Sequence, residues 1–237
     1  MDRAVYVTAA GMNASIDRLR RISVNMANGS TPGFKRTISR LRGERGGGTG
    51  HFNRELRPVM EPESLDLSQG GVTRTGRPLD LAIRGRGFFA VETASGRRYT
   101  RKGRMYRNSD GELVDAGGHP FVSDRGVLSL PPDAAQITVT PDGDVLADGQ
   151  ELGTLRVVTV PEQEKLVRES WCLLRNDGQP AEEATDCSFT QGALEKSNVN
   201  PLREMVDLMD TVRAYEGNAR VMRRMDSVKK QLIQTLS

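Results

Sequence analysis

Two amphipathic segments, one at each end of the chain, constrain its fold more than any other feature of the sequence. In each segment apolar residues recur every three or four positions, which is typical of one face of an α-helix and close to a seven-residue repeat. Because an exposed apolar stripe of this length promotes aggregation, another surface must cover it. The two stripes consist of Val5, Ala9, Met12, Ile16, Leu19, Ile22 and Met26, and of Leu202, Met205, Met209, Val212, Tyr215, Ala219, Met222, Met225, Val228 and Leu232.

The residues after the first segment predict where its helix ends. The helix should run from about Asp2 to about Asn28. Pro32 lacks the backbone N–H that a helix needs, and together with Gly33 it prevents the helix from continuing. We therefore expect a turn directly after the first helix.

The second helix carries the usual signal for a helix start. Asn200 is suited to the N-cap, Pro201 to the first helical position, and Asn198 lies just before them. The simplest cover for either stripe is the other helix, in a parallel or antiparallel pair that resembles a coiled coil. Some apolar residues lie outside the two stripes, and they pack either on a β domain between the helices or on other copies of the chain. They are Val7, Ala10, Val24, Val206, Leu208 and Val221. The methionine-rich second stripe favours other copies, since methionine adapts to neighbours in slightly different positions.

Between the helices, from Gly71 to about Gln191, short apolar runs are separated by turns. Leu79, Leu81 and Ile83 alternate with other residues and predict a half-buried strand, while "GFFAVE", "QITVT" and "LRVVTV" predict further strands. Four Asp-Gly pairs supply the positive φ angles of tight turns, at Asp110-Gly111, Asp142-Gly143, Asp148-Gly149 and Asp177-Gly178. This region predicts one antiparallel, all-β domain.

The segment from Lys35 to about Gly70 has a different composition. It contains the glycine run Gly46–Gly48, two prolines and few large apolar residues, so it buries too little surface to order itself alone. We expect an extended connector. The chain is thus an α+β protein with an N-terminal helix and turn at 1–34, the connector at 35–70, a β domain at 71–191 and a C-terminal helix at 192–237.

The composition of the 237 residues narrows the classes of function. A hydrophobic share of 36% is low for one compact globule, so we expect an extended shape or surfaces that become buried in an assembly. The net charge is only +3, and the basic stretch from Arg36 to Arg57 has Phe52 as its one aromatic residue. This favours a solvated loop over a nucleic-acid site. No stretch approaches the ~20 apolar residues of a membrane span, and charges follow Met1 too closely for a signal peptide.

No pattern in the sequence predicts catalysis, a cofactor or a metal site. "GRGFFA" lacks the third glycine of a dinucleotide fingerprint, and no helix follows it. Cys172 and Cys187 make no metal motif with His51 and His119, and a nucleophilic cysteine would have only His119 as a partner. Whether the two cysteines form a disulfide is left open. We therefore expect no enzyme and no small-molecule substrate.

Three stretches of the chain, taken together, resemble the flagellar basal-body rod and hook family. "NMANGSTPGFKR" is similar to the family's signature after its first helix, and "TGRPLDLAIRGRGFFAVE" with "YTRKGRM" is similar to the start of its β domain. "GALEKSNVNPLREMVDLMDTVRAYEGNARVM" is similar to its C-terminal helix. The opening "MDRAVYV" and the "STPGF" turn are most similar to the proximal-rod subunit. The pair of cysteines is unusual for the family.

The resemblance implies a function as well as a fold. It implies a structural subunit that the flagellar type III apparatus exports without signal cleavage. It also implies that the subunit polymerises with itself and other rod proteins in the periplasm. Terminal helices of many copies would form the inner tube of a hollow drive shaft that transmits torque, with β domains outside. The helix residues implied as the assembly interface are Val5, Met12, Ile16, Leu19, Met26, Leu202, Met205, Met209, Val212 and Met222.

The signature turn comprises Asn25, Asn28, Thr31, Pro32, Gly33 and Phe34. Our hypothesis is that the two asparagines bond to free carbonyls at the helix end and to loop amides nearby. Thr31, Pro32 and Gly33 would turn the chain outward, and Phe34 would anchor it.

Three alternative functions remain open from the sequence. One is a distal-rod subunit of the same family. The second is an enzyme built on the β domain, such as a cell-wall hydrolase. The third is a secreted adhesin or a nucleic-acid-binding module on the basic stretch.

Overall fold

The computed structural model describes residues 2–38, 41–45, 56–60, 64–134, 136–170, 172–184 and 186–236. His51, Phe52, the run Gly46–Gly48 and the side chain of Leu232 lie outside this description. Contacts group the chain into a helix unit of Met1–Ala27, Thr37–Glu63 and Val199–Ser237, and a β unit of Asn28–Arg36 and Ser64–Asn198. Each unit thus combines segments that are distant in the sequence. The domain limits predicted from the sequence instead divide the chain into consecutive segments.

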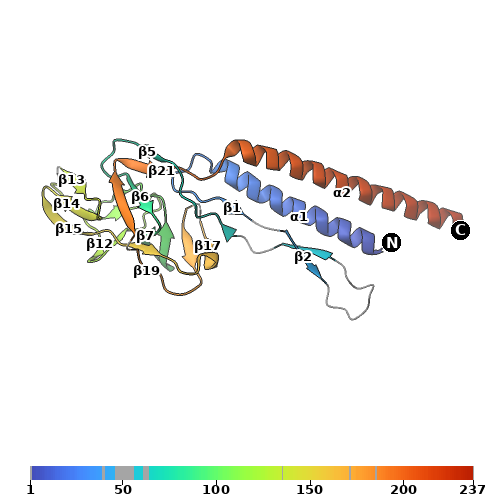
Figure 1. Cartoon of the computed structure of the whole chain (residues 1–237), viewed down its shortest axis with the longest axis horizontal. Helices are drawn as coiled ribbons and strands as arrows, with labels where there is room; N and C mark the ends of the chain where they lie inside the picture. Colours follow the sequence, from blue (N-terminus) through green and yellow to red (C-terminus); the bar gives the residue numbers. More distant parts are fainter. Residues whose placement is uncertain are drawn as a thin grey trace. The chain divides into compact units, whose positions relative to one another are not determined.

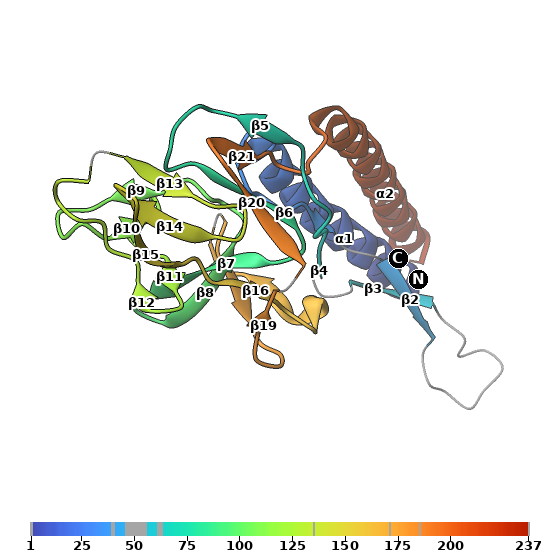
Figure 2. The ribbon, with the colours of Figure 1, turned by 60° about the vertical axis from the view of Figure 1, so that its left-hand side comes forward.

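Two long helices dominate the helix unit. α1 spans Asp2–Ala27 and α2 spans Pro201–Leu236, close to the limits that the sequence predicts. The helices lie side by side and run in opposite directions (Figures 1 and 2), because Gly11 is beside Asn218 and Arg18 is beside Asp207. The protein is therefore α+β, as predicted, with its two helices in antiparallel contact.

The connector contains regular structure that its composition does not predict. After the short β1 (Thr37–Ile38), strands β2 (Leu41–Arg45) and β3 (Leu56–Met60) form an antiparallel ladder, and β3 lies near α1. A ladder is held by backbone hydrogen bonds and needs few large apolar side chains. For this reason the scarcity of apolar residues does not prevent the segment from pairing.

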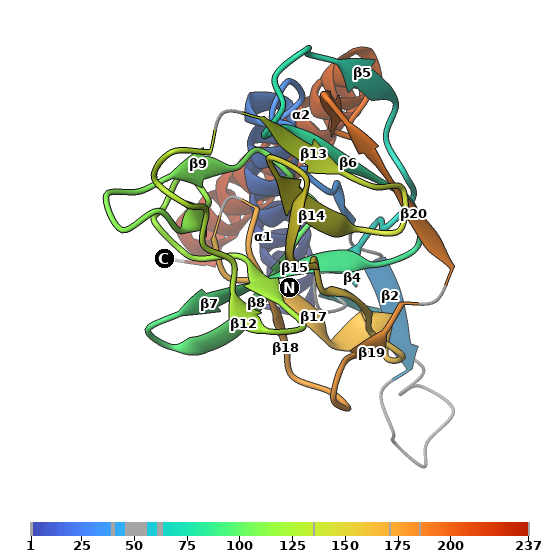
Figure 3. The same cartoon turned by 90° about the vertical axis from the view of Figure 1, so that its left-hand side faces the viewer.

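The β unit consists of short strands and one 3₁₀ turn (Figure 3), and every ladder between its strands is antiparallel. Its elements are β4 Ser64–Leu65, β5 Val72–Arg74, β6 Leu81–Gly85, β7 Phe88–Thr93, β8 Gly96–Thr100, β9 Tyr106–Arg107, β10 Leu113–Val114, β11 Val122–Ser123, β12 Gly126–Val127, β13 Ile137–Val139, β14 Asp144–Ala147, β15 Gln150–Thr154, β16 Val157–Thr159, η1 Gln163–Lys165, β17 Leu166–Arg168, β18 Leu174–Asn176, β19 Glu182–Glu183, β20 Cys187–Gln191 and β21 Ala193–Glu195.

The largest sheet has six strands in the order β17-β18-β8-β7-β16-β19, and β13-β14-β15 form a second sheet. The remaining strands of the unit pair in twos. Among them, β20 pairs with β6 and β21 pairs with β5, so the end of the β region returns to its beginning. The β unit consequently extends through Asn198, beyond the limit near Gln191 that turn composition suggests.

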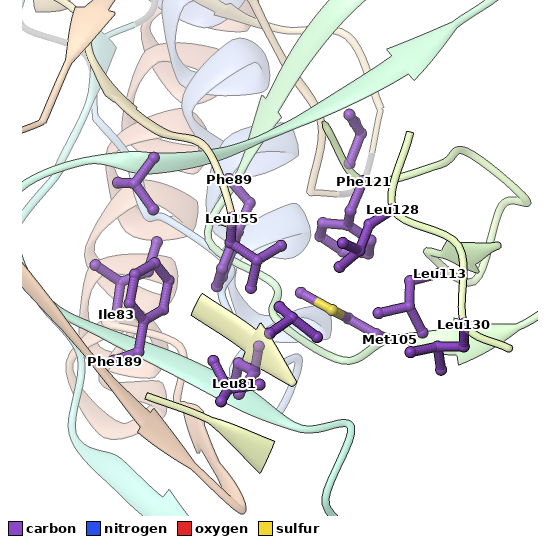
Figure 4. Packing of buried hydrophobic residues seen from close by; sticks show 14 residues of the cluster. Leu81, Ile83, Phe89, Met105, Leu113, Phe121, Leu128, Leu130, Leu155 and Phe189 are labelled. Carbon is purple, nitrogen blue, oxygen red and sulfur yellow. The ribbon is translucent and has the colours of Figure 1, made fainter. Parts of the chain in front are cut away.

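The position of strand β7 explains why four consecutive residues of "GFFAVE", Phe88 to Val91, are apolar. Successive side chains of a strand point to opposite faces. Phe89 and Val91 enter one hydrophobic cluster (Figure 4), in which the Phe89 and Phe121 rings meet edge to face with centroids 5.7 Å apart. Phe88 and Ala90 enter a second cluster. The sheet is therefore covered by apolar packing on both faces at this strand.

The strand at Leu81–Gly85 differs from the half-buried strand that its alternation predicts. Leu81, Ala82 and Ile83 are all buried, and Asp80 just before them is 1% exposed. The Asp80 carboxylate lies 3.6 Å from a guanidinium nitrogen of Arg77 and 3.4 Å from one of Arg104. Paired charges and a small alanine make burial of both faces possible, and neither effect is visible in the alternation.

The Asp-Gly turns follow the prediction at three of their four positions. Between β14 and β15, Asp148 has φ 49° and Gly149 has φ 85°, as a two-residue hairpin turn requires. Gly111 and Gly143 also have positive φ. Gly178 does not, so the prediction is wrong for the pair Asp177-Gly178.

Candidate functional site

Position 33 in the signature turn can be occupied only by glycine. Gly33 has φ +72°, and its N–H donates to the carbonyl of Glu195 over 2.8 Å. A Cβ atom at this position would lie 2.4 Å from the backbone nitrogen of Lys102. Both the backbone conformation and the close approach of another segment thus require glycine here.

Asn25, near the end of α1, bonds to the backbone of Thr37 in β1. Its Nδ2 donates to the Thr37 carbonyl and its Oδ1 accepts from the Thr37 N–H, both over 3.0 Å. The same Nδ2 lies 3.3 Å from Oε2 of Glu204 on α2. One buried amide therefore ties together three segments of the helix unit.

The remaining turn residues belong to the β unit. The Asn28 side-chain oxygen accepts a hydrogen bond from the Thr31 hydroxyl over 3.1 Å. Phe34 is 1% exposed, and the Arg168 guanidinium lies 4.1 Å from its ring centroid, so Phe34 has the buried position expected of an anchor. Pro32 presents its carbonyl to the Cys172 thiol, 3.8 Å away.

Beside this turn, three charged residues meet inside the β unit. Lys35 Nζ lies 2.6 Å from Glu195 Oε1, and Arg101 Nη1 lies 3.6 Å from Glu195 Oε2. All three side chains are almost fully buried. Burial lowers the pKa of Lys35 although Glu195 acts in the opposite direction, and burial likewise lowers the pKa of Arg101.

Sequence reasoning missed this cluster, although a signal was present. Lys35 lies in "NMANGSTPGFKR", Arg101 lies in "YTRKGRM", and Glu195 lies in "GALEKSNVNP". Each of the three motifs that carry the family resemblance therefore contributes one charge to the same buried point. A charged residue inside each motif was the available clue, but the pairing needs the fold.

The residues before α2 have two different roles. Asn200 caps the helix, since its Oδ1 accepts from the N–H groups of Leu202 and Arg203 over 3.1 and 3.2 Å. Pro201 is the first helical residue. Asn198 belongs to the β unit, where its Oδ1 accepts from the Arg36 N–H over 2.7 Å and its Nδ2 donates to the carbonyls of Asp66 and Ser68.

The residues predicted for the assembly interface differ in burial between the two helices. On α1, Val5, Met12, Ile16, Leu19 and Met26 are partly buried. On α2, Met222 is partly buried, whereas four residues near the start of the helix are exposed: Leu202 (71%), Met205 (44%), Met209 (49%) and Val212 (38%). The start of the second stripe is thus left uncovered by α1.

Most of the buried side chains of the two helices are polar, although Ala14 and Ile22 of α1 are buried as well. α1 buries Thr8, Ser15 and Asn25, while α2 buries Glu204 and Thr211. The apolar side chains at the start of α2 lie on a different face. The helix unit therefore has a mostly polar interior and an apolar exterior at this end.

One cavity in the β unit, of about 310 Å³, is lined by both Cys172 and His119. His119 Nδ1 lies 3.1 Å from both carboxylate oxygens of Asp115. Burial raises the pKa of the Cys172 thiol, and a protonated thiol is a weak nucleophile. Cys172 and Cys187 are both free thiols.

Membrane spanning and metal binding are two further possibilities for the part of the chain that the structure describes. Its helices include none with the length and apolar character that crossing a membrane requires. Within the same residues, His, Cys, Asp and Glu side chains form no group of three that could hold a metal ion.

These features are typical of a structural protein that assembles with other subunits. They are two long terminal helices, a β unit with buried residues from three motifs, and an exposed apolar stripe. Known proteins identify the family. The profile "Flagellar basal body rod FlgEFG protein C-terminal" matches residues 190–235, and "Flagellar hook protein FlgE/F/G D1 domain" matches residues 82–147.

Individual relatives match along the whole chain. The flagellar basal-body rod protein FlgF of Caulobacter vibrioides is 32% identical over 100% of this chain and 98% of its own length. FlgF of Mesorhizobium japonicum is 31% identical with the same coverage, and the rod protein FlgG of Agrobacterium fabrum is 31% identical over 95% of this chain and 96% of its own length. The chain belongs to the flagellar basal-body rod protein family and is a structural subunit of the rod. The comparisons also support the proximal type that its opening residues predict.

Proposed function

We propose that the chain assembles with other copies and other rod proteins through its helix unit, as part of a hollow shaft that transmits torque. The uncovered stripe at the start of α2 carries this proposal. Fully burying one large apolar side chain is worth about 1.5–3 kcal/mol, so four such residues offer a neighbour a substantial gain. Methionines at two of the positions can adapt to subunits in slightly different settings.

We further propose that the two helices pair in a coiled-coil-like manner. Thr8, Ser15 and Ile22 are buried on α1 at intervals of seven residues. On α2 the buried Glu204 and Thr211 are also seven apart, and Asn218, beside Gly11, continues the series. This is the spacing of a coiled-coil seam. Because the seam is largely polar, it specifies alignment more than it supplies stability, which leaves the apolar stripe for other subunits.

Substitution of the stripe tests the assembly proposal. Leu202→Gln with Met209→Gln should abolish rod formation and motility, because both side chains would be buried against a neighbour. The isolated variant should keep the circular dichroism spectrum and unfolding midpoint of the parent, since both positions are exposed in one chain. The matched control is Val167→Gln, a similarly exposed apolar residue at 42% in the β unit.

Two results would decide against the proposal. One is normal rod yield, counted by electron microscopy of basal bodies, in the double variant. The other is an equal loss of rods in the Val167→Gln control, which would show that any added polar residue disturbs export or folding.

We also propose that the protein has no catalytic role. The raised pKa of Cys172 and its contact with the Pro32 carbonyl support this. Cys172→Ser should leave motility intact, and the purified protein should not cleave peptidoglycan. Cleavage that disappears in Cys172→Ser would favour the hydrolase alternative, and tight, steeply salt-dependent DNA binding would favour the nucleic-acid alternative.

The place of the protein in the cell is part of the same proposal. Family membership supports a location in the basal body. A position in the periplasmic stretch of the rod and export by the flagellar type III apparatus, without signal cleavage, follow as expectations. The mass of the protein recovered from purified basal bodies would show whether its N-terminus is retained.

A further inference from the structure

We propose that Lys35, Glu195 and Arg101 form a charge latch that makes two segments of the β unit dock only together. The first segment, residues 31–36, contains the end of the signature turn and the two residues after it. The second segment, residues 193–198, contains β21 and the three residues after it. Lys35 belongs to the first and Glu195 to the second, while Arg101 follows β8 on the body of the unit. This inference concerns the single chain and goes beyond the assembly of copies proposed above.

The latch rests first on the burial of its charges. Lys35 is 2% exposed and Glu195 is 1% exposed, with 2.6 Å between Nζ and Oε1. An unpaired charge at such a site is strongly unfavourable, whereas a paired and hydrogen-bonded charge is tolerated. Lys35 can therefore occupy its site only when Glu195 is present, and Glu195 needs a cation in the same way.

Further hydrogen bonds complete the surroundings of the pair. Lys35 Nζ donates to the Ser68 carbonyl over 2.7 Å, and the Gly70 N–H donates to Glu195 Oε1 over 3.0 Å. Arg101 donates to the carbonyls of Ile83 and Gly85. The latch thus also holds the stretch around Ser68 and Gly70, which lies between β4 and β5.

Backbone contacts join the same two segments directly. The Gly33 N–H donates to the Glu195 carbonyl, and the Asn198 N–H donates to the Phe34 carbonyl over 3.4 Å. The Arg36 N–H donates to the Asn198 side chain. None of these bonds can form unless both segments are docked. The backbone hydrogen bonds and the charge pairing therefore both require that the two segments dock together.

The latch is asymmetric, which distinguishes it from an ordinary ion pair. Loss of the Glu195 charge removes the carboxylate that pairs with both buried cations, Lys35 and Arg101, while Asp66 still acts on Lys35. Loss of Lys35 leaves Glu195 with Arg101 at 3.6 Å and with the Gly70 N–H. Removing the glutamate charge should therefore open both segments more than removing the lysine charge.

Hydrogen exchange measured by mass spectrometry on the full chain tests the latch. In Glu195→Gln, which keeps the shape of the side chain, we expect exchange at residues 31–36 to rise roughly 100-fold or more, the effect expected for breaking a buried pair. Lys35→Met should raise exchange at residues 193–198, though less. The control Glu151→Gln breaks an exposed pair with Arg125 and should change neither segment.

The double variant Lys35→Met with Glu195→Gln separates coupling from independent damage. A latch predicts slower exchange in the double variant than in Glu195→Gln alone, because one unpaired cation has been removed. Independent structural roles predict that the two effects add. If Glu195→Gln does not fold, the latch is tested by Lys35→Met alone.

The latch is overturned if Glu195→Gln leaves residues 31–36 unchanged, or if the two substitutions add in the double variant. In Lys35→Met, it is overturned if faster exchange stays confined to the turn itself, without any effect at residues 193–198.

Discussion

The helix unit and the β unit bury opposite kinds of side chain. The β unit encloses two apolar clusters, one on each face of β7. The helix unit buries mostly polar side chains, namely Thr8, Ser15, Asn25, Glu204 and Thr211 beside Ala14 and Ile22, while apolar residues at the start of α2 are exposed. The hydrophobic effect rewards removal of apolar surface from water. The β unit thus gains this stabilisation within one chain, whereas in the assembly proposed above the helix unit would obtain much of it from neighbours.

Truncation inside the β core should have the largest effect on the single chain. Phe89→Ala removes a ring that is 1% exposed and packs against Phe121 and Phe189, so it should lower the free energy of unfolding by about 3–5 kcal/mol. Chemical denaturation followed by circular dichroism measures the loss. Val127→Ala, at 44% exposure, should stay within about 0.5 kcal/mol of the parent. Equal effects would refute a self-sufficient β core.

A side chain added to the signature turn should have the next largest effect. Gly33 and Gly76 have nearly equal φ, +72° and +74°, but only Gly33 has backbone atoms within contact of an added Cβ. Gly76→Ala should cost about 1–2 kcal/mol for its conformation alone, and Gly33→Ala a further ~1–3 kcal/mol for overpacking. Thermal unfolding of both variants gives the difference. Identical losses would mean that the turn is not packed against Lys102.

The helix unit should respond more weakly, at its buried polar contacts. Asn25→Ala leaves the amide and carbonyl of Thr37 without their side-chain partner and should cost about 1–3 kcal/mol. Faster hydrogen exchange of the Thr37 N–H reports the change directly. Asn13→Ala, an exposed position on the same helix, should leave that exchange unchanged. An unaffected Thr37 N–H in Asn25→Ala would show that the polar interior does not order this unit.

The smallest effect should come from two surface carboxylates of the β unit, Glu169 and Asp177, when acid protonates them. A hydrogen bond from Arg98 lowers the pKa of Glu169 below its ordinary 4.5, and one from Arg175 lowers the pKa of Asp177 below its ordinary 3.8. The unfolded chain then binds more protons than the folded chain in this range, so these groups stabilise the fold above their ordinary pKa values. The contribution disappears as the pH falls through the lower folded-state pKa values.

The unfolding midpoint should accordingly fall by a few degrees at most for these two groups, in thermal scans at decreasing pH. Glu169→Gln with Asp177→Asn should remove that part of the slope. A slope that persists in the double variant would have to come from other carboxyl groups.

The local elements of this protein can be predicted from its amino-acid sequence. The apolar spacing predicts both helices, and Asn200 with Pro201 predicts where α2 begins, because capping and backbone preference act over a few residues. The turn glycine and the β-strand runs are local in the same sense. Family resemblance follows from these short motifs and requires no knowledge of their contacts.

Which helix faces and which charges meet depends on the three-dimensional fold. The stripe from Leu202 to Val212 predicts an apolar face, but not that α1 would contact the polar face beside it. Likewise, nothing near Lys35 in the sequence indicates Glu195 as its partner. Burial and charge pairing depend on segments far apart in the chain, so their energies are defined only once the fold has brought those segments together.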